Sequence, residues 1–165
     1  MSTQHERILP HSNDAEKSVL GAILLDKDVY FDVSEFINET DFYSDAHREI
    51  FSAMKDLQQN GENIDILTVC ERLNKRGYLE AAGGRSYVTL LSAVVPTTSN
   101  AGQYAKVVAE KSVLRKLINA SQRITEDAFS EKLDSRDVLG EAERSILDIS
   151  KKNQTGDYVH IGDVM

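Results

Sequence analysis

The 165-residue sequence has one cysteine, Cys70, and no long hydrophobic run. A single cysteine excludes a disulfide within the chain and a cysteine-rich metal site. No segment approaches the roughly 18 apolar residues of a membrane-spanning helix, and the first residues lead into no apolar region typical of secretory signals. These absences predict a cytoplasmic protein without membrane contact. Cys70 falls on an apolar helix face, which predicts a buried, unreactive thiol.

Catalytic signatures are absent as well. A phosphate-binding loop needs Gly-x4-Gly-Lys-Ser/Thr, and the nearest stretch, Gly83-Gly84-Arg85-Ser86, has arginine in place of lysine. No Gly-x-Ser-x-Gly elbow or His-Glu-x-x-His pair occurs. His47 lies near Asp45 and Glu49, but residues two apart on a helix do not face each other. We therefore expect a structural, hydrogen-bonded His47 and no catalytic, cofactor-binding or metal-binding residue; a small enzyme built on His47 is a minor alternative.

The charge of the chain argues against a nucleic-acid track. The formal net charge is −8, and only residues 100–130 lean basic, with five bases against three acids. Phosphate binding normally requires a basic stripe or patch. A solvated helix face with salt-bridge partners is the favoured interpretation, and it covers the following bases: Lys106, Lys111, Arg115, Lys116 and Arg123.

Hydrophobic spacing predicts an all-α fold, because no segment shows the clean alternation of a strand. We expect a compact head of about five to six short helices over residues 12–99. They include a short helix over residues 28–38, a helix on which His47, Ile50, Phe51, Met54 and Leu57 share one face, and a fifth helix with its apolar residues at Tyr87, Leu90, Leu91 and Val94. Predicted N-caps are Asn13, Ser44 and Asn100, Asp65 is expected to start another helix, and predicted helix ends are Asp26, Asn60-Gly61, Gly77 and Pro96. Gly21 lies inside the first helix at a cost of about 1 kcal/mol relative to alanine, which indicates either close helix packing or simple tolerance.

A long antiparallel helical hairpin is predicted over residues 100–152. Its first helix would be about 40 Å long, and Ser135 would cap the return helix after a polar break. Two helices cannot cover all of their apolar side chains, and a second stripe of Val108, Leu114 and Ile118 remains open. The hairpin is therefore predicted to be an assembly surface, with these self-association residues: Tyr104, Val107, Leu114, Leu117, Ile124, Leu139 and Ile146.

The two ends of the chain are expected to differ from this core. Residues 1–11 resemble a flexible lead, and residues 153–157 resemble a linker. An apolar pattern resumes at Tyr158 and stops at Met165, so we expect the natural chain to continue.

Several motifs occur in one order from about residue 8 to 150. They are Pro10–Gly21 (PHSNDAEKSVLG), Asp41-Phe42-Tyr43 with His47, Ile50 and Phe51, Gly83-Gly84 with Tyr87 and Leu90, Val95–Ala101 (VPTTSNA) with Tyr104, and Glu110–Ile118 (EKSVLRKLI). In combination, though not singly, these motifs specifically resemble one family, the N-terminal domain of bacterial DnaB-type replicative DNA helicases.

This resemblance implies the following function. In the family, hairpins pair two subunits, and a trimer of dimers forms a collar above a hexameric ring. A RecA-like motor domain, absent from this sequence, binds ATP and Mg, hydrolyses ATP and moves 5′ to 3′ on single-stranded DNA. The collar binds a DnaG-type primase, and a helicase loader protein places the ring on DNA. By position, the candidate primase contacts are Asp14, Tyr87, Ile118 and Ile124.

The resemblance implies that residues 153–165 begin the linker to the motor and that the fragment alone is inactive. The alternative is a self-contained helical oligomerisation or adaptor domain of a different regulator. The continuation of the gene would separate the two, since only a helicase would continue into an ATPase.

Overall fold

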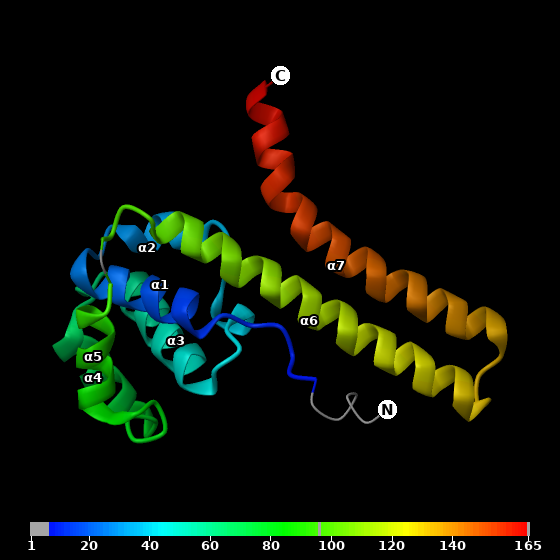
Figure 1. Cartoon of the computed structure of the whole chain (residues 1–165), viewed down its shortest axis with the longest axis horizontal. Helices are drawn as coiled ribbons and strands as arrows, with labels where there is room; N and C mark the ends of the chain where they lie inside the picture. The colour runs from blue at the N-terminus through cyan, green and yellow to red at the C-terminus, as the bar shows by residue number, and fades with distance from the viewer. Residues whose placement is uncertain (1–6, 96, 165) are drawn as a thin grey trace. The chain divides into compact units, whose positions relative to one another are not determined.

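The computed structural model describes the backbone of residues 7–95 and 97–164, and the side chains of residues 7–95 and 97–152. All regular secondary structure in these residues is helical, which confirms the predicted fold class (Figure 1). The chain divides into two compact units. One, the head, comprises residues 11–110, and the other, the hairpin unit, comprises residues 7–10 together with 111–164.

In its described residues the head contains five helices, one short 3-10 helix and the start of a sixth helix around a single hydrophobic core. Helix α3 shows how the sequence builds this core: Ile50, Phe51, Met54 and Leu57 lie three, four, seven and ten positions after His47 on one face of the helix, and all five residues are buried. The elements are α1 (Asn13–Leu25), α2 (Val29–Ser34), η2 (Glu39–Asp41), α3 (Asp45–Gln59), α4 (Ile66–Arg76), α5 (Gly84–Ala93) and the first ten residues of α6 (Ala101–Ser130).

Capping fixes the boundaries of α3 and α4 where the sequence places them. The Ser44 side chain accepts a hydrogen bond from the backbone N–H of His47. Asp65 and Thr68 cap each other's backbone N–H groups at the start of α4, and Gly77 ends that helix with a φ of 80°. The predicted cap Asn13 is wrong, because Asn13 is the first helical residue and the Ser12 side chain accepts from the N–H of Ala15.

Two other helices differ from their predicted extents or faces. The helix expected over residues 28–38 is limited to Val29–Ser34. In α5 the buried residues are Val88 and Leu91, whereas Leu90 and Val94, expected in the core, are exposed. The predicted helix end at Pro96 lies outside the described residues.

Gly21 marks a close approach of α1 and α5. A Cβ atom added at Gly21 would lie 2.1 Å from the carbonyl oxygen of Leu91 and 2.3 Å from a methyl carbon of Val95. No side chain fits in that space without a shift of the backbone. The interpretation of Gly21 as a close-packing residue is confirmed.

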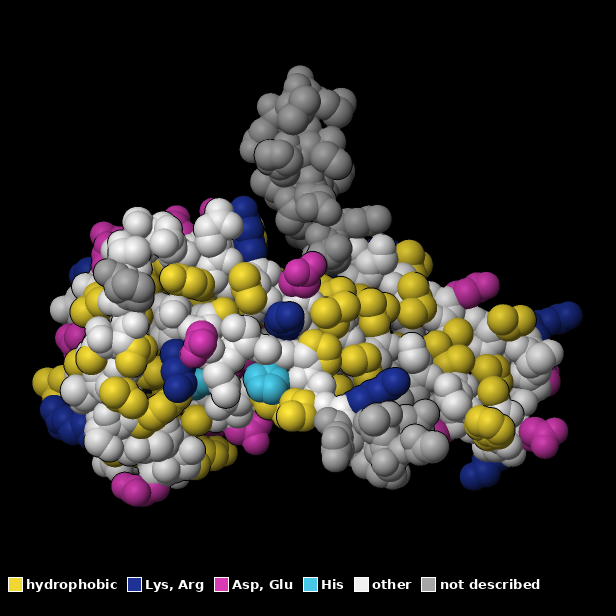
Figure 2. Space-filling view, viewed as in Figure 1, with side chains coloured by type: hydrophobic (Ala, Val, Ile, Leu, Met, Phe, Trp, Pro, Cys, Tyr) yellow, Lys and Arg dark blue, Asp and Glu magenta, His cyan; other side chains and the backbone are white. Residues whose placement is uncertain are grey.

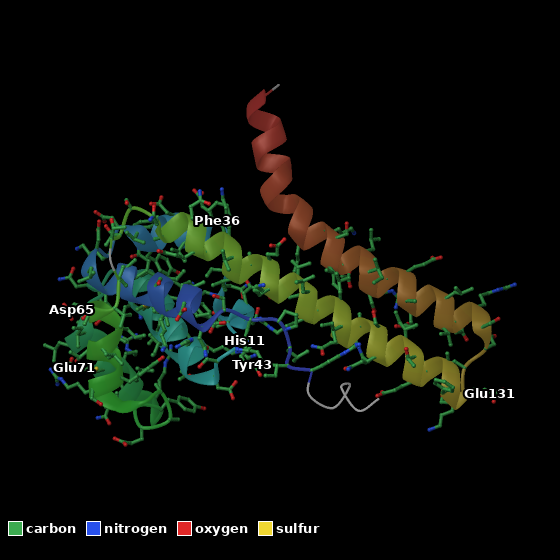
Figure 3. All side chains as sticks on the ribbon, in the orientation of Figure 1. His11, Phe36, Tyr43, Asp65, Glu71 and Glu131 are labelled. Carbon is green, nitrogen blue, oxygen red and sulfur yellow. The ribbon has the colours of Figure 1, made fainter. Side chains whose placement is uncertain are left out.

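The hairpin unit pairs the remainder of α6 with α7 (Ser135–Val164), and the two helices run in opposite directions (Figure 1). Glu131 makes the turn with a φ of 54° (labelled in Figure 3). The N-cap of α7 is Asp134, whose Oδ1 accepts from the N–H of Asp137 at 2.9 Å, so the predicted cap Ser135 is wrong. The α7 backbone also continues beyond Lys152, the predicted end of the return helix. The assignment of residues 153–165 to a linker stays a prediction.

Candidate assembly and docking surfaces

The hairpin presents large apolar side chains to solvent. Figure 2 shows them as a yellow run along this part of the chain. Of the predicted self-association residues in the hairpin unit, Leu114, Leu139 and Ile146 are 41%, 62% and 42% exposed, while Leu117 and Ile124 are half-buried. The prediction missed three further exposed residues: Phe129, Leu133 and Leu147. An exposed apolar set of this size indicates an interaction surface.

The two remaining self-association candidates, Tyr104 and Val107, lie on the first ten residues of α6 and belong to the head. Val107 is exposed, whereas Tyr104 is half-buried and packs against the head core. No observation assigns either residue to a subunit contact, so both stay predictions.

Helix α6 buries a different face from the one that its large apolar residues predict. The buried residues of α6 are Ala101, Ala105, Val108, Ser112, Arg115 and Ala120; all except Arg115 are small, and the first five follow steps of four, three, four and three. The predicted open stripe is therefore partly wrong, because Val108 is buried and Ile118 half-buried. The regular spacing of small residues is the signal in the sequence that would have identified this face.

The basic residues of α6 do not form one solvated face. Arg115 is buried, and its Nη1 donates a hydrogen bond to the carbonyl oxygen of Pro10 at 2.8 Å. In the head, the Lys106 ammonium lies 5.3 Å from the ring centroid of Phe36, within cation–π range. The predicted solvated face is therefore wrong for Arg115, and residue Pro10 of the predicted flexible lead has a defined contact.

A buried polar network crosses the head. Glu16 of α1 and His47 of α3 are each 1% exposed, and Glu16 Oε1 lies 2.7 Å from His47 Nδ1. The backbone N–H of Tyr43 donates to Glu16 Oε2 at 2.7 Å, and that of Ser44 donates to Oε1 at 3.3 Å. On the other side of the imidazole, His47 Nε2 lies 2.6 Å from the Tyr87 hydroxyl of α5. The network thus joins α1, the connector before α3, α3 and α5.

The network stabilises the ionised form of Glu16. Burial alone would raise the pKa of this carboxyl, but the hydrogen bonds from His47, Tyr43 and Ser44 outweigh burial and lower it. The Tyr87 phenol keeps its proton, because burial and the nearby Glu16 carboxylate raise its pKa. The sequence did not predict that Glu16 and Tyr87 belong to a buried network, because their hydrogen-bond partners are distant along the chain. The interpretation of His47 as a structural, hydrogen-bonded histidine is confirmed.

An aromatic pair lies next to this network. The rings of His11 and Tyr43 stack with centroids 4.1 Å apart and planes at 13° (labelled in Figure 3). The same Tyr43 whose backbone N–H binds Glu16 therefore also holds His11, which the sequence predicted to lie in a flexible lead.

The four candidate primase contacts lie in different surroundings. In the head, Asp14 is exposed in the first turn of α1, where a carboxylate also favours the helix dipole, and Tyr87 is half-buried against His47. In the hairpin unit, Ile118 and Ile124 are half-buried on α6. All four stay predictions.

The described residues lack two further features. They contain no group of three or more His, Cys, Asp or Glu side chains that could hold a metal ion. None of their helices is long and apolar enough to cross a membrane. The predicted burial of Cys70 is confirmed, and burial raises the pKa of its thiol.

Comparisons with known proteins agree on one family. The family model of the DnaB-like helicase N-terminal domain matches residues 8–110. The replicative DNA helicase DnaB of Leifsonia xyli subsp. xyli is 39% identical over 160 residues, which are 97% of this chain and 35% of that protein. DnaB of Geobacillus stearothermophilus shows the same identity and coverage. This chain therefore spans about a third of the length of these relatives.

Solved structures give the same result. The crystal structure of the N-terminal domain of DnaB helicase from Mycobacterium tuberculosis matches with a TM-score of 0.82 and 39% identity, covering 86% of this chain and 99% of that one. A DnaB-like replicative helicase, solved in a study of its interactions with primase, matches with a TM-score of 0.68 and 27% identity, covering 84% of this chain and 30% of that one. The chain belongs to the family of DnaB-like helicase N-terminal domains.

Proposed function

We propose that this chain is the N-terminal assembly and primase-docking domain of a hexameric replicative DNA helicase. The full-length protein would act in the cytoplasm, bind ATP and Mg in a separate motor domain and unwind duplex DNA 5′ to 3′ on a single strand. A loader protein would place it on DNA. The similar helicases, of which this chain matches about a third, support the proposal.

The observation that carries the assembly function is the apolar surface of the hairpin unit. Leu114 on α6 and Leu139, Ile146 and Leu147 on α7 are each more than two-fifths exposed. Fully burying one such side chain contributes about 1.5–3 kcal/mol. Burial of several of them against the same surface of a second copy would stabilise a dimer, and three such dimers could then close into a ring.

The oligomeric state of matched variants tests this function. Ile146→Asp places a charge in the proposed subunit contact, where a buried unpaired charge costs about 3–5 kcal/mol, and it should shift the chain toward monomer in sedimentation velocity. Leu67→Asp is the control, because Leu67 is equally apolar, 51% exposed and located on the head. Circular dichroism would show whether both variants keep their helices. A wild-type monomer at high concentration, or an equal effect of both substitutions, would refute the assembly function.

Primase docking rests on the similar helicase whose interactions with primase were studied. We expect the 165-residue chain to bind the primase encoded in the same genome, and isothermal titration calorimetry would measure the affinity. The chain itself should bind single-stranded DNA weakly, since its net charge is −8. Tight DNA binding together with no primase binding would favour a different regulator.

A further inference from the structure

Residues Pro10 and His11 are neighbours in the chain but belong to different units. The hairpin unit contains residues 7–10 and resumes at residue 111, whereas the head contains residues 11–110. The chain therefore passes between the two units twice, once at the peptide bond from Pro10 to His11 and once within α6, between residues 110 and 111. We call the first of these crossings the N-terminal connection.

Each side of the N-terminal connection is bound within its own unit. In the hairpin unit, Nη1 of the buried Arg115 donates a hydrogen bond to the Pro10 carbonyl oxygen at 2.8 Å. In the head, the His11 ring stacks on Tyr43 with centroids 4.1 Å apart (Figure 3). Tyr43 is fixed in turn, because its backbone N–H donates to Glu16 of the buried network. Each anchor therefore belongs to the packed structure of one unit.

The N-terminal connection has little slack between its two anchors. The Pro10 carbonyl belongs to the planar peptide group that it shares with His11, so only the φ torsion and the side-chain torsions of His11 separate the bound carbonyl from the stacked ring. Consecutive Cα atoms lie about 3.8 Å apart. The residues that hold Pro10 and His11 therefore cannot move far apart while both contacts remain.

We propose that the N-terminal connection is a conformational restraint: Arg115 and the stack of His11 on Tyr43 together limit how far the hairpin unit can turn relative to the head. Compact units of one chain are expected to move relative to each other unless something restrains them, and α6 alone is a single crossing about which they could bend. The two anchors act in series, so the loss of either one releases the restraint. The restraint acts within one chain and does not depend on the proposed assembly or primase docking.

Distance measurements between two spin labels test the restraint. In the 165-residue chain with Cys70→Ala, the labels are placed at Glu71→Cys on α4 of the head and Lys132→Cys in the turn of the hairpin unit, since both residues are exposed. An excess of unlabelled chain confines the measured distances to one molecule. His11→Ala and Arg115→Met should each broaden the distance distribution of this parent chain. The double variant should be no broader than the broader single variant, because the anchors act in series.

Matched variants separate the two contacts from general effects. His11→Phe keeps a ring that can stack on Tyr43, and it should keep the narrow distribution. Arg123→Met is the same substitution as Arg115→Met at an exposed arginine of α6 in the hairpin unit, and it should leave the distribution unchanged. Circular dichroism would show that each variant keeps its helices.

The possible results each support or refute the restraint. A broad distribution in the parent chain, or unchanged distributions in His11→Ala and Arg115→Met, would refute it. It also fails if His11→Phe broadens the distribution as much as His11→Ala, if Arg123→Met does so as much as Arg115→Met, or if the double variant is broader than both single variants. If Arg115→Met does not fold, the comparison of His11→Ala with His11→Phe still decides.

Discussion

The contact between α1 and α5 at Gly21 predicts a large effect from one added methyl group. In Gly21→Ala the new Cβ would meet the Leu91 carbonyl oxygen at 2.1 Å and the Val95 side chain at 2.3 Å. Val95 could rotate away, but the carbonyl belongs to the backbone, so the helices must separate.

The expected magnitude is the balance of two effects. Overpacking a core typically costs about 1–3 kcal/mol, and separating two helices by their backbones belongs at the upper end. Replacing glycine by alanine inside a helix regains up to about 1 kcal/mol. We expect a net loss of roughly 2 kcal/mol, which lowers the melting temperature of a chain this long by about 4–8 °C.

The assay is urea unfolding followed by circular dichroism at one fixed protein concentration, because self-association shifts apparent stability. Gly140→Ala is the control: Gly140 lies inside α7 and an added Cβ there has nothing within 4 Å. It should leave the stability unchanged or raise it by about 0.5–1 kcal/mol. If Gly21→Ala is as stable as Gly140→Ala, the close approach of α1 and α5 is not required by the fold.

Two further predictions concern buried titratable groups. Because the pKa of the Glu16 carboxyl is lowered in the folded head, its contribution to stability is present above the ordinary pKa of 4.5 and is lost as the pH falls toward the folded-state pKa. In acid unfolding monitored by circular dichroism, Glu16→Gln should therefore lose less stability between pH 5 and 3 than the wild-type chain. An equal loss in both would exclude Glu16 as the cause. Burial and the raised pKa of Cys70 predict slow reaction with a thiol reagent in buffer and fast reaction in urea; rapid labelling of the native chain would contradict its burial.

The sequence predicted features that depend on neighbouring residues. The cap Ser44 and the shared face of α3 depend on residues no more than a few helical turns apart, and the predicted helix start at Asp65 depends on the residues beside it. Periodicity and capping rules therefore suffice for the all-α fold. Three of the exposed apolar residues of the hairpin, Leu114, Leu139 and Ile146, were predicted for the same reason.

Features that depend on distant partners could not be predicted in this way. Glu16 lies one turn into α1, where the sequence alone would allow an exposed carboxylate, yet its side chain turns inward because His47, 31 residues away, offers a proton. Arg115 has the sequence context of a solvated helix face, but it is buried and donates a hydrogen bond to Pro10, 105 residues away. The buried face of α6 was not predicted, because the predicted face was based on large apolar side chains. The residues that are buried, such as Ala101 and Ala105, are mostly small but regularly spaced.

The separation of Glu16, His47 and Tyr87 along the chain also bears on how the head reaches one structure. The network spans 31 and 40 residues between its members, so it closes only after α1, α3 and α5 have packed. If α1 slid by one turn, apolar contacts could largely be replaced, but Glu16 would be enclosed without its three donors. An unpaired buried carboxylate costs several kcal/mol. We expect the network to discriminate against such misaligned packings, which the interchangeable aliphatic side chains around it would tolerate.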